Sequence, residues 1–215
     1  MIHDGVTING KHSYKDFDLC IKRRAFSTPE RQSIRETVPF MHGYYDFSTL
    51  NGEPSFTERT VSYTFDVIAD TVEELENKRR AILDWLMNVN EAVIQDDTIP
   101  DYHFVGSYDS CSMDEDDYGD VMELQVTFVC QPFQIANVPS QNILKAGTHT
   151  VIVRGQTVTP TAYATAEATI QIGNLVTGIP AGIETVLGIN LEKGANEVTV
   201  TSTGTVTLSW YEEVI

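Results

Sequence analysis

The chain has 215 residues, 41% of them apolar, so it can fold around a core and is not expected to be disordered. It carries 31 acidic and 14 basic residues, a formal net charge of −17. This charge argues against a protein that binds the phosphates of a nucleic acid, because such binding needs clustered Lys and Arg residues. A soluble surface is the simplest explanation, and a wall past which DNA slides without sticking is the alternative.

The charge is unevenly distributed, which favours two domains. Residues 1–135 contain 25 acids and 11 bases, whereas residues 136–215 contain 6 and 3. The three cysteines, Cys20, Cys111 and Cys130, include no C-x-x-C pair, so buried thiols are expected and a disulfide framework or zinc site is not. The N-terminus has no signal-peptide pattern, and no apolar run approaches the roughly 18 residues that cross a membrane.

The first part of the chain predicts a hairpin, a short strand and an arm. Asn9-Gly10 suits the type I′ turn of a hairpin over residues 6–12. Alternating apolar residues near Phe17, Leu19 and Ile21 predict a short strand. Residues 24–56 show no clean period and contain several prolines and glycines, so we expect a long loop or irregular arm. A loop of this length is usually functional or packed against a partner.

The middle of the chain has the clearest patterns. Thr71-Val72-Glu73-Glu74 is a capping box, and apolar residues at helical spacing predict a helix that runs to about Asn88. Alternation also predicts antiparallel strands over residues 57–68 and 121–130. The apolar positions of the first strand are Val61, Tyr63, Phe65 and Val67.

The composition changes after a proline-containing junction, within which we place a linker at 136–147. From residue 148 the chain is rich in Thr, Val, Ile, Ala and Gly. Many short strands without a helix predict a small β-sandwich over 148–215, with Thr203-Gly204 turning the last two strands into a hairpin. The expected strands are 149–153, 167–172, 185–192, 196–201 and 205–211.

No motif for catalysis or cofactor binding occurs in the sequence. It lacks a nucleophile elbow, a phosphate-binding loop, a dinucleotide loop and an H-E-x-x-H zinc motif. The five histidines are scattered through both halves. We therefore predict no catalytic residue, no metal site and no cofactor, and a protein that is not an enzyme.

The densest acidic cluster lies in residues 114–120. Asp114, Asp116 and Gly119 match positions 1, 3 and 6 of a calcium loop, but Tyr118 and Gln125 stand where the loop needs other residues. The remaining interpretations are a solvated acidic turn and an acidic loop that faces a pore. The candidate residues of this loop are Asp114, Glu115, Asp116, Asp117 and Asp120.

A cluster of large apolar side chains lies in the turn-rich arm. Such side chains are expected to be covered by something. They either cap the core of their own domain or contact another subunit, because Tyr, Phe and Met are enriched at interface centres. The candidate interface residues are Phe40, Met41, Tyr44, Tyr45 and Phe47.

These features follow one another in a recognisable order. The segments are Ile8-Asn9-Gly10, Ser13-Tyr14-Lys15-Asp16-Phe17, Val38-Pro39-Phe40-Met41-His42-Gly43-Tyr44-Tyr45-Asp46-Phe47-Ser48, Tyr63-Thr64-Phe65, Trp85-Leu86, Pro100-Asp101-Tyr102-His103-Phe104-Val105-Gly106 and Val206-Thr207-Leu208-Ser209-Trp210. In their order and spacing the chain resembles the distal tail proteins of long-tailed (siphovirus-type) bacteriophages and prophages. The resemblance covers most of 5–135 and, more loosely, 146–215. One departure is Pro39-Phe40, where a Pro-Gly is expected.

The resemblance implies a mainly β fold and a structural role. Residues 1–135 would form an N-terminal β-sandwich with one flanking α-helix, and residues 148–215 a galectin-like, carbohydrate-module-like β-sandwich. Six copies would form a ring that joins the tail tube protein to the tail-tip or baseplate proteins, with a receptor-binding protein as a further candidate partner. DNA would pass through the lumen without specific binding. The protein would assemble in the bacterial cytoplasm and reside at the tail tip of the virion, with no contact to a membrane.

Two other functions fit the same pattern. One is a different baseplate component. The other is a carbohydrate-binding or adsorption module, which would need exposed aromatic residues on the C-terminal sandwich. Only Tyr163, Trp210 and Tyr211 are available there. Trp210 alternates in phase with Val206 and Leu208, so we expect it in the core.

Overall fold

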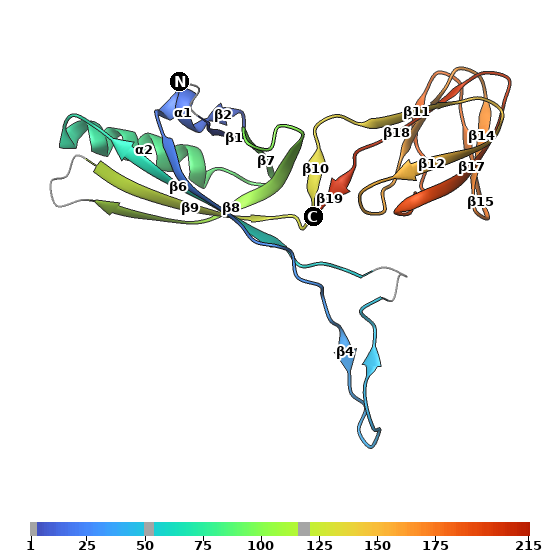
Figure 1. The fold of residues 1–215 in the computed structure, drawn as a ribbon, viewed down its shortest axis with the longest axis horizontal. Helices are drawn as coiled ribbons and strands as arrows, with labels where there is room; N and C mark the ends of the chain where they lie inside the picture. The colour runs from blue at the N-terminus through green and yellow to red at the C-terminus, as the bar shows by residue number, and fades with distance from the viewer. Residues whose placement is uncertain (1–3, 50–53, 116–120) are drawn as a thin grey trace. The chain divides into compact units, whose positions relative to one another are not determined.

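The computed structural model describes residues 4–49, 54–115 and 121–215. The chain divides between Phe133 and Gln134 into two compact units. Both units are built mainly of antiparallel strands (Figure 1), which confirms the mainly β fold class.

The first unit is an antiparallel sheet with a helix against it. Its strands follow the order β2-β1-β7-β8-β9-β6-β3. The elements are β1 Val6–Ile8, β2 Lys11–His12, α1 Ser13–Phe17, β3 Cys20–Phe26, β4 Arg35–Glu36, β5 Tyr45–Asp46, β6 Arg59–Ile68, α2 Val72–Met87, β7 Ala92–Asp96, β8 Tyr102–Glu115 and β9 Val121–Cys130.

The N-terminal hairpin is confirmed, and the strand expected beside it is corrected. Asn9 and Gly10 have φ of 49° and 79°, as a type I′ turn requires. Around Phe17 the chain forms the short helix α1, whose cap is the His12 imidazole: its Nδ1 accepts the N–H groups of Tyr14 and Lys15 at 3.1 and 3.2 Å. Histidine is not a preferred N-cap, so this helix has no recognisable start signal in the sequence.

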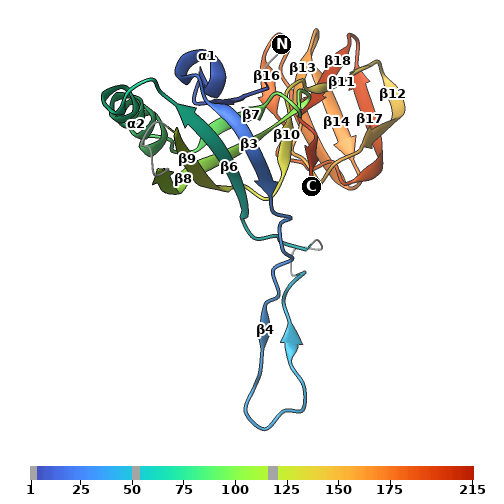
Figure 2. The same cartoon turned by 60° about the vertical axis from the view of Figure 1, so that its left-hand side comes forward.

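The sheet curls around a core that α2 covers (Figure 2). Arg24 of β3 pairs with Asp96 of β7 at 2.8 Å, although β6, β9 and β8 lie between these strands in the sheet. Trp85 of α2 donates from Nε1 to the carbonyl of Ile8 at 3.0 Å. The predicted inward residues of β6 are all buried in this core, namely Val61, Tyr63, Phe65 and Val67.

The N-cap residue of α2, Thr71, is expected to stabilise the fold. Thr71 Oγ1 accepts the N–H of Glu74 at 3.2 Å, while the Glu74 carboxylate accepts the N–H of Asp70 at 3.1 Å. Thr71→Ala should lower the free energy of unfolding by about 1 kcal/mol, because one helix donor loses its acceptor. Denaturant unfolding measures the change. Thr71→Ser keeps the hydroxyl and should behave as wild type; an equal loss in both variants would assign the effect to the methyl group.

The second unit is a β-sandwich of two four-stranded sheets with an apolar core between them. One sheet has the order β11-β18-β13-β16 and the other β12-β17-β14-β15. The elements are β10 Gln134–Ala136, β11 Ser140–Leu144, β12 Gly147–Val153, β13 Thr161–Ala164, β14 Ala168–Ile172, β15 Leu175–Ile179, β16 Glu184–Val186, β17 Gly194–Ser202, β18 Val206–Trp210 and β19 Glu213–Val214.

Two details of the second unit differ from expectation. The segment placed in the linker 136–147 contributes strand β11, which pairs with β18. The strands on either side of Thr203-Gly204 form no hairpin: β17 pairs with β12 and β14, whereas β18 pairs with β11 and β13. The turn therefore connects one sheet to the other. A hairpin and such a connection have the same apolar alternation in their strands, so the sequence pattern does not distinguish them.

Candidate functional site

The described residues of the arm, 27–49 and 54–58, form a long hairpin between the end of β3 and the start of β6 (Figure 1; Figure 2). Strands β4 and β5 pair within it, and backbone bonds continue the ladder from Phe47 N to Ile34 O at 2.8 Å and from Gln32 N to Ser55 O at 2.8 Å. Both faces of the hairpin are largely exposed, so its sequence has no periodic apolar pattern.

Side chains hold the outer part of the arm together. Arg35 pairs with Asp46 at 3.5 Å, and its guanidinium lies 4.6 Å from the centre of the Tyr44 ring. The Ser48 hydroxyl accepts the N–H of Ile34 at 2.9 Å. Hydrogen bonds from Ser48 lower the pKa of Asp46, so this carboxylate remains charged at neutral pH. The arm is therefore a defined element and presents a fixed surface.

The tip of the arm is a tight turn in which Phe40 has a left-handed backbone. Val38 O accepts the N–H of Met41 at 3.1 Å, Pro39 takes the second position, and Phe40 follows with φ of 69°. These are the features of a type II turn, whose third position favours Gly or Asn. The turn is thus formed despite the missing glycine, and the left-handed conformation costs a bulky residue about 1–2 kcal/mol.

The five candidate interface residues all lie on this outer part of the arm. None of them belongs to the hydrophobic core of either unit among the described residues. Tyr45 and Phe47 stack on each other with ring centres 6.2 Å apart. Their exposed fractions are 109% for Phe40, 37% for Met41, 50% for Tyr44, 53% for Tyr45 and 41% for Phe47.

The sheet of the first unit has a second distinctive surface, which we call the polar sheet face. Alternate residues of β3, β6, β9 and β8 are buried in the core. The residues between them point to the opposite side of the sheet and form this face. Small polar residues dominate it, and Ser62 and Thr127 are hydrogen-bonded across β6 and β9 at 3.1 Å. Further members are Arg23, Ala25, Thr60, Thr64, Gln125 and Ser112.

One end of the polar sheet face is acidic. Asp66, Glu123 and Asp114 stand in register on β6, β9 and β8. Lys22 pairs with Asp66 at 3.5 Å and with Glu123. Of the predicted acidic loop, Asp114 is exposed and belongs to this row, and Glu115 is the last residue of β8. The other candidates, Asp116, Asp117 and Asp120, lie outside the described residues.

A groove between α1 and α2, which we call the helix groove, was not predicted because α1 was not. Its volume is about 620 Å³. Apolar atoms of Phe17, Ala81 and Ile82 line it, together with Lys15 and Asp18. The Phe17 ring stacks on Trp85 with centres 4.4 Å apart, so the groove wall is anchored in the core.

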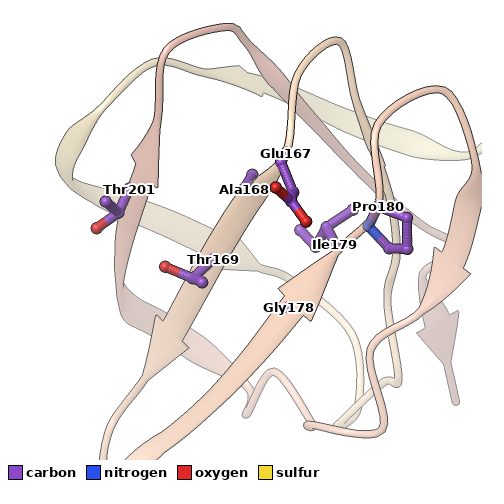
Figure 3. A pocket seen from close by; sticks show the side chains of 7 residues that line it. All are labelled: Glu167, Ala168, Thr169, Gly178, Ile179, Pro180 and Thr201. Carbon is purple, nitrogen blue, oxygen red and sulfur yellow. The ribbon is translucent and has the colours of Figure 1, made fainter.

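The second unit carries a hollow of about 460 Å³ at β14, β15 and β17 (Figure 3). Gly178 opens it, because the β-carbon position of this residue has no neighbour within 4 Å. Glu167, Thr169 and Thr201 supply polar groups, but no described lining residue is aromatic. Trp210 is buried in the sandwich core as predicted. No stacking surface for a sugar ring is thus found at this hollow.

The described residues form neither a metal cluster nor a membrane-spanning helix. Among the described residues, no group of three or more His, Cys, Asp and Glu side chains is placed to hold a metal ion. None of the described helices is both long and apolar enough to cross a bilayer. The calcium-loop hypothesis rests largely on residues 116–120, which lie outside the described residues.

Comparison with known proteins addresses the fold and the family. No curated protein sequence matches the chain. The crystal structure of the Dit protein (gp 19.1) of phage SPP1, described as a paradigm of the hub adsorption apparatus in phages that infect Gram-positive bacteria, is similar with a TM-score of 0.77 and 14% identity, over 99% of each chain. The phage p2 baseplate, in a calcium-activated structure, has a chain with a TM-score of 0.47 and 9% identity, over 97% of this chain and 98% of that one. The likeness to SPP1 Dit shows a shared fold.

Family membership follows from the sequence of the first unit. Residues 13–130 match the family described as the phage tail protein RIFT-related domain. The match spans more than half of the chain and runs from α1 to the end of β9. The chain therefore belongs to the family of phage tail proteins with the RIFT-related domain.

Proposed function

We propose that this phage tail protein is a structural hub, six copies of which form a ring that joins the tail tube to the tail-tip or baseplate proteins. The observation that carries the proposal is the arm, which holds five large apolar side chains outside both cores. Exposed apolar clusters of this kind usually mark protein–protein contacts. The shared fold with SPP1 Dit, a hub protein by its description, supports the same role.

The polar sheet face supports a lumen through which DNA passes. A wall that DNA slides along should offer neither an apolar patch nor clustered cations, because either would hold the duplex. The outward side chains of β6, β9 and β8 are mainly small and polar, and Asp66, Glu123 and Asp114 add carboxylates. We place this face on the inner wall of the ring, with Asp114 at its acidic end.

The partners and location follow from this role. The ring would bind the tail tube protein on one side and tail-tip proteins on the other, with a receptor-binding protein as a further partner. It would reside at the tail tip of the virion after assembly in the host cytoplasm. No cofactor and no catalytic residue are needed for any of these contacts.

The oligomeric state of the purified chain tests the proposal. Light scattering coupled to size exclusion should give six times the chain mass of 24.0 kDa, or twelve times for two stacked rings. Electron microscopy of the same peak should show a ring whose inner wall is more acidic than its outer wall. A monomer at high concentration, and also in the presence of the tail tube protein, would contradict the ring. A ring with a neutral or basic lumen would contradict the placement of the polar sheet face.

A further inference from the structure

Phe40 has a side chain that its backbone position does not favour. The third position of the tip turn has positive φ, where glycine is best, yet the chain places a phenyl ring there. No described residue of the same chain covers this ring, since Phe40 is fully exposed. Residues in strained backbone conformations tend to occur at functional sites. We therefore expect the Phe40 phenyl ring to contact another molecule, and the free energy of that contact to offset the conformational cost of the turn.

The helix groove has the chemistry that such a ring needs. Phe17, Ala81 and the buried Ile82 form the apolar part of its lining, and Ala81 leaves room on the exposed side of α2. Charged residues also line the groove, and two of them, Glu74 and Lys78, pair with each other at 3.2 Å. Lys15 lies at the same groove, where an ammonium group attracts the face of an aromatic ring. A volume of about 620 Å³ lies within the range of pockets that enclose a bound group.

Other described hollows match the ring less well. The depression on the polar sheet face is lined by Lys22, Ser62, Glu123 and their polar neighbours. The hollow of the second unit has Glu167 and two threonines at its opening. Burying a phenyl ring in either place would remove polar groups from water without new hydrogen bonds.

The arm tip and the groove of one chain lie at opposite ends of the same strands. Helix α1 precedes β3 and α2 follows β6, whereas the arm connects the end of β3 to the start of β6. The ten residues of β6 span about 33 Å. The tip projects beyond the far end, so it reaches a groove only on a different copy.

We infer that Phe40 at the arm tip inserts into the helix groove of the neighbouring copy. The inference rests on the proposed ring and names the contact that builds it. Each copy has one tip and one groove on different surfaces, so the contact is head-to-tail, and repeated head-to-tail contacts form a ring when the rotation between copies closes. Tyr44 and Lys15 would lie at the rim of this contact, and Phe40 at its centre.

Site-directed cross-linking tests the contact without altering Phe40. Met41→Cys and Ala81→Cys place one thiol beside Phe40 and one in the groove, both at partly or fully exposed positions. With a short bismaleimide, the double variant should give a ladder of covalent multimers up to the ring. Cys20 and Cys111 are partly exposed, so all variants carry serine at both positions, whereas Cys130 is buried and burial raises its pKa to about 12. Each single-cysteine variant is the control and should give no ladder.

The outcomes separate this contact from the ring itself. Rings that contain the double variant but yield no ladder would overturn the groove as the receptor and leave the hub proposal intact. A wild-type chain that forms no oligomer, alone or with the tail tube protein, would overturn both.

Phe40→Gly gives an independent prediction in which stability and assembly change in opposite directions. Glycine suits the left-handed position, so the unfolding midpoint of the monomer should stay the same or rise. The concentration for half-assembly should rise at least tenfold, because the central aromatic residue of the contact is lost. Gly43→Ala, at another positive-φ position of the arm, is the control and should leave assembly near wild type. Unchanged assembly of Phe40→Gly would remove Phe40 from the interface.

Discussion

Deletion of residues 40–47 should give monomers in place of the proposed ring, while the unfolding midpoint of the chain remains unchanged. The deletion removes the five candidate interface residues, none of which belongs to a core of the described chain, and leaves Ile34 and Val38 as the other exposed large apolar residues of the described arm. The deletion removes β5 and thus the partner of β4, but the backbone bond from Gln32 N to Ser55 O lies outside the cut, so a shorter hairpin can form at the base of the arm. The effect on assembly should therefore be large and the effect on folding small.

Light scattering and thermal unfolding measure the two quantities on the same samples. A variant of full length, with the five apolar residues replaced by serine, is the matched control for the length of the arm. It should also be monomeric, because the proposal assigns the contact to these side chains. Rings of normal size from the deletion variant would show that the arm does not build the interface. Monomers that unfold far below wild type would show that the arm stabilises its own domain.

The regular elements of the first unit were predictable because each has one buried face. Strand β6 alternates strictly, and α2 combines a Thr71 cap with apolar residues at helical spacing. Such patterns arise from the contact of one face with a core. The helix α1 gave no such pattern, because it has five residues and a histidine cap. Short elements that depend on tertiary contacts cannot be predicted from local sequence alone.

The candidate site was predictable in its residues but not in its geometry. Composition identified the arm and its cluster from Phe40 to Phe47, and left open whether these side chains cover their own core. The answer depends on how far the hairpin extends from the sheet, which is set by long-range pairing. The helix groove also depends on long-range contacts, because Phe17 and Ala81 lie 64 positions apart in the sequence, and it could not be predicted. The row formed by Asp66, Glu123 and Asp114 likewise depends on strand register.

Curling of the sheet connects its stability to the surfaces proposed for assembly. The end of β3 at the arm and the end of β7 are held together across the core by Arg24 and Asp96. Phe26, at the base of the arm, packs against Phe104 of β8 with ring centres 5.3 Å apart. The base of the arm is thus fixed by buried contacts, whereas its tip remains available to another molecule. A rigid base is what allows an exposed arm to find one site reproducibly.

Replacement of Asp96 by Asn should produce the largest loss of stability of any single substitution considered for the first unit. The Asp96 side chain has no exposed surface, and it accepts hydrogen bonds from Arg24 Nε at 2.8 Å and from the N–H and hydroxyl of Thr98 at 2.8 and 2.6 Å. The amide cannot balance the Arg24 charge. Removing one partner of a buried pair costs about 3–5 kcal/mol, and the partial exposure of Arg24 places the expected loss near the lower limit, about 3 kcal/mol.

A double-mutant cycle separates the pair from other effects of the substitution. Asp96→Asn combined with Arg24→Gln should be clearly more stable than the sum of the single losses predicts, because neither variant group is then left with an unpaired charge. Asp66→Asn, which affects the exposed Lys22 pair on the opposite face, is the matched control and should shift the denaturation midpoint much less. Additive losses in the cycle would show that Asp96 acts through Thr98 alone and does not tie β7 to β3. In that case the curl of the sheet, and with it the fixed direction of the arm, would depend on apolar packing around Phe26 and Phe104.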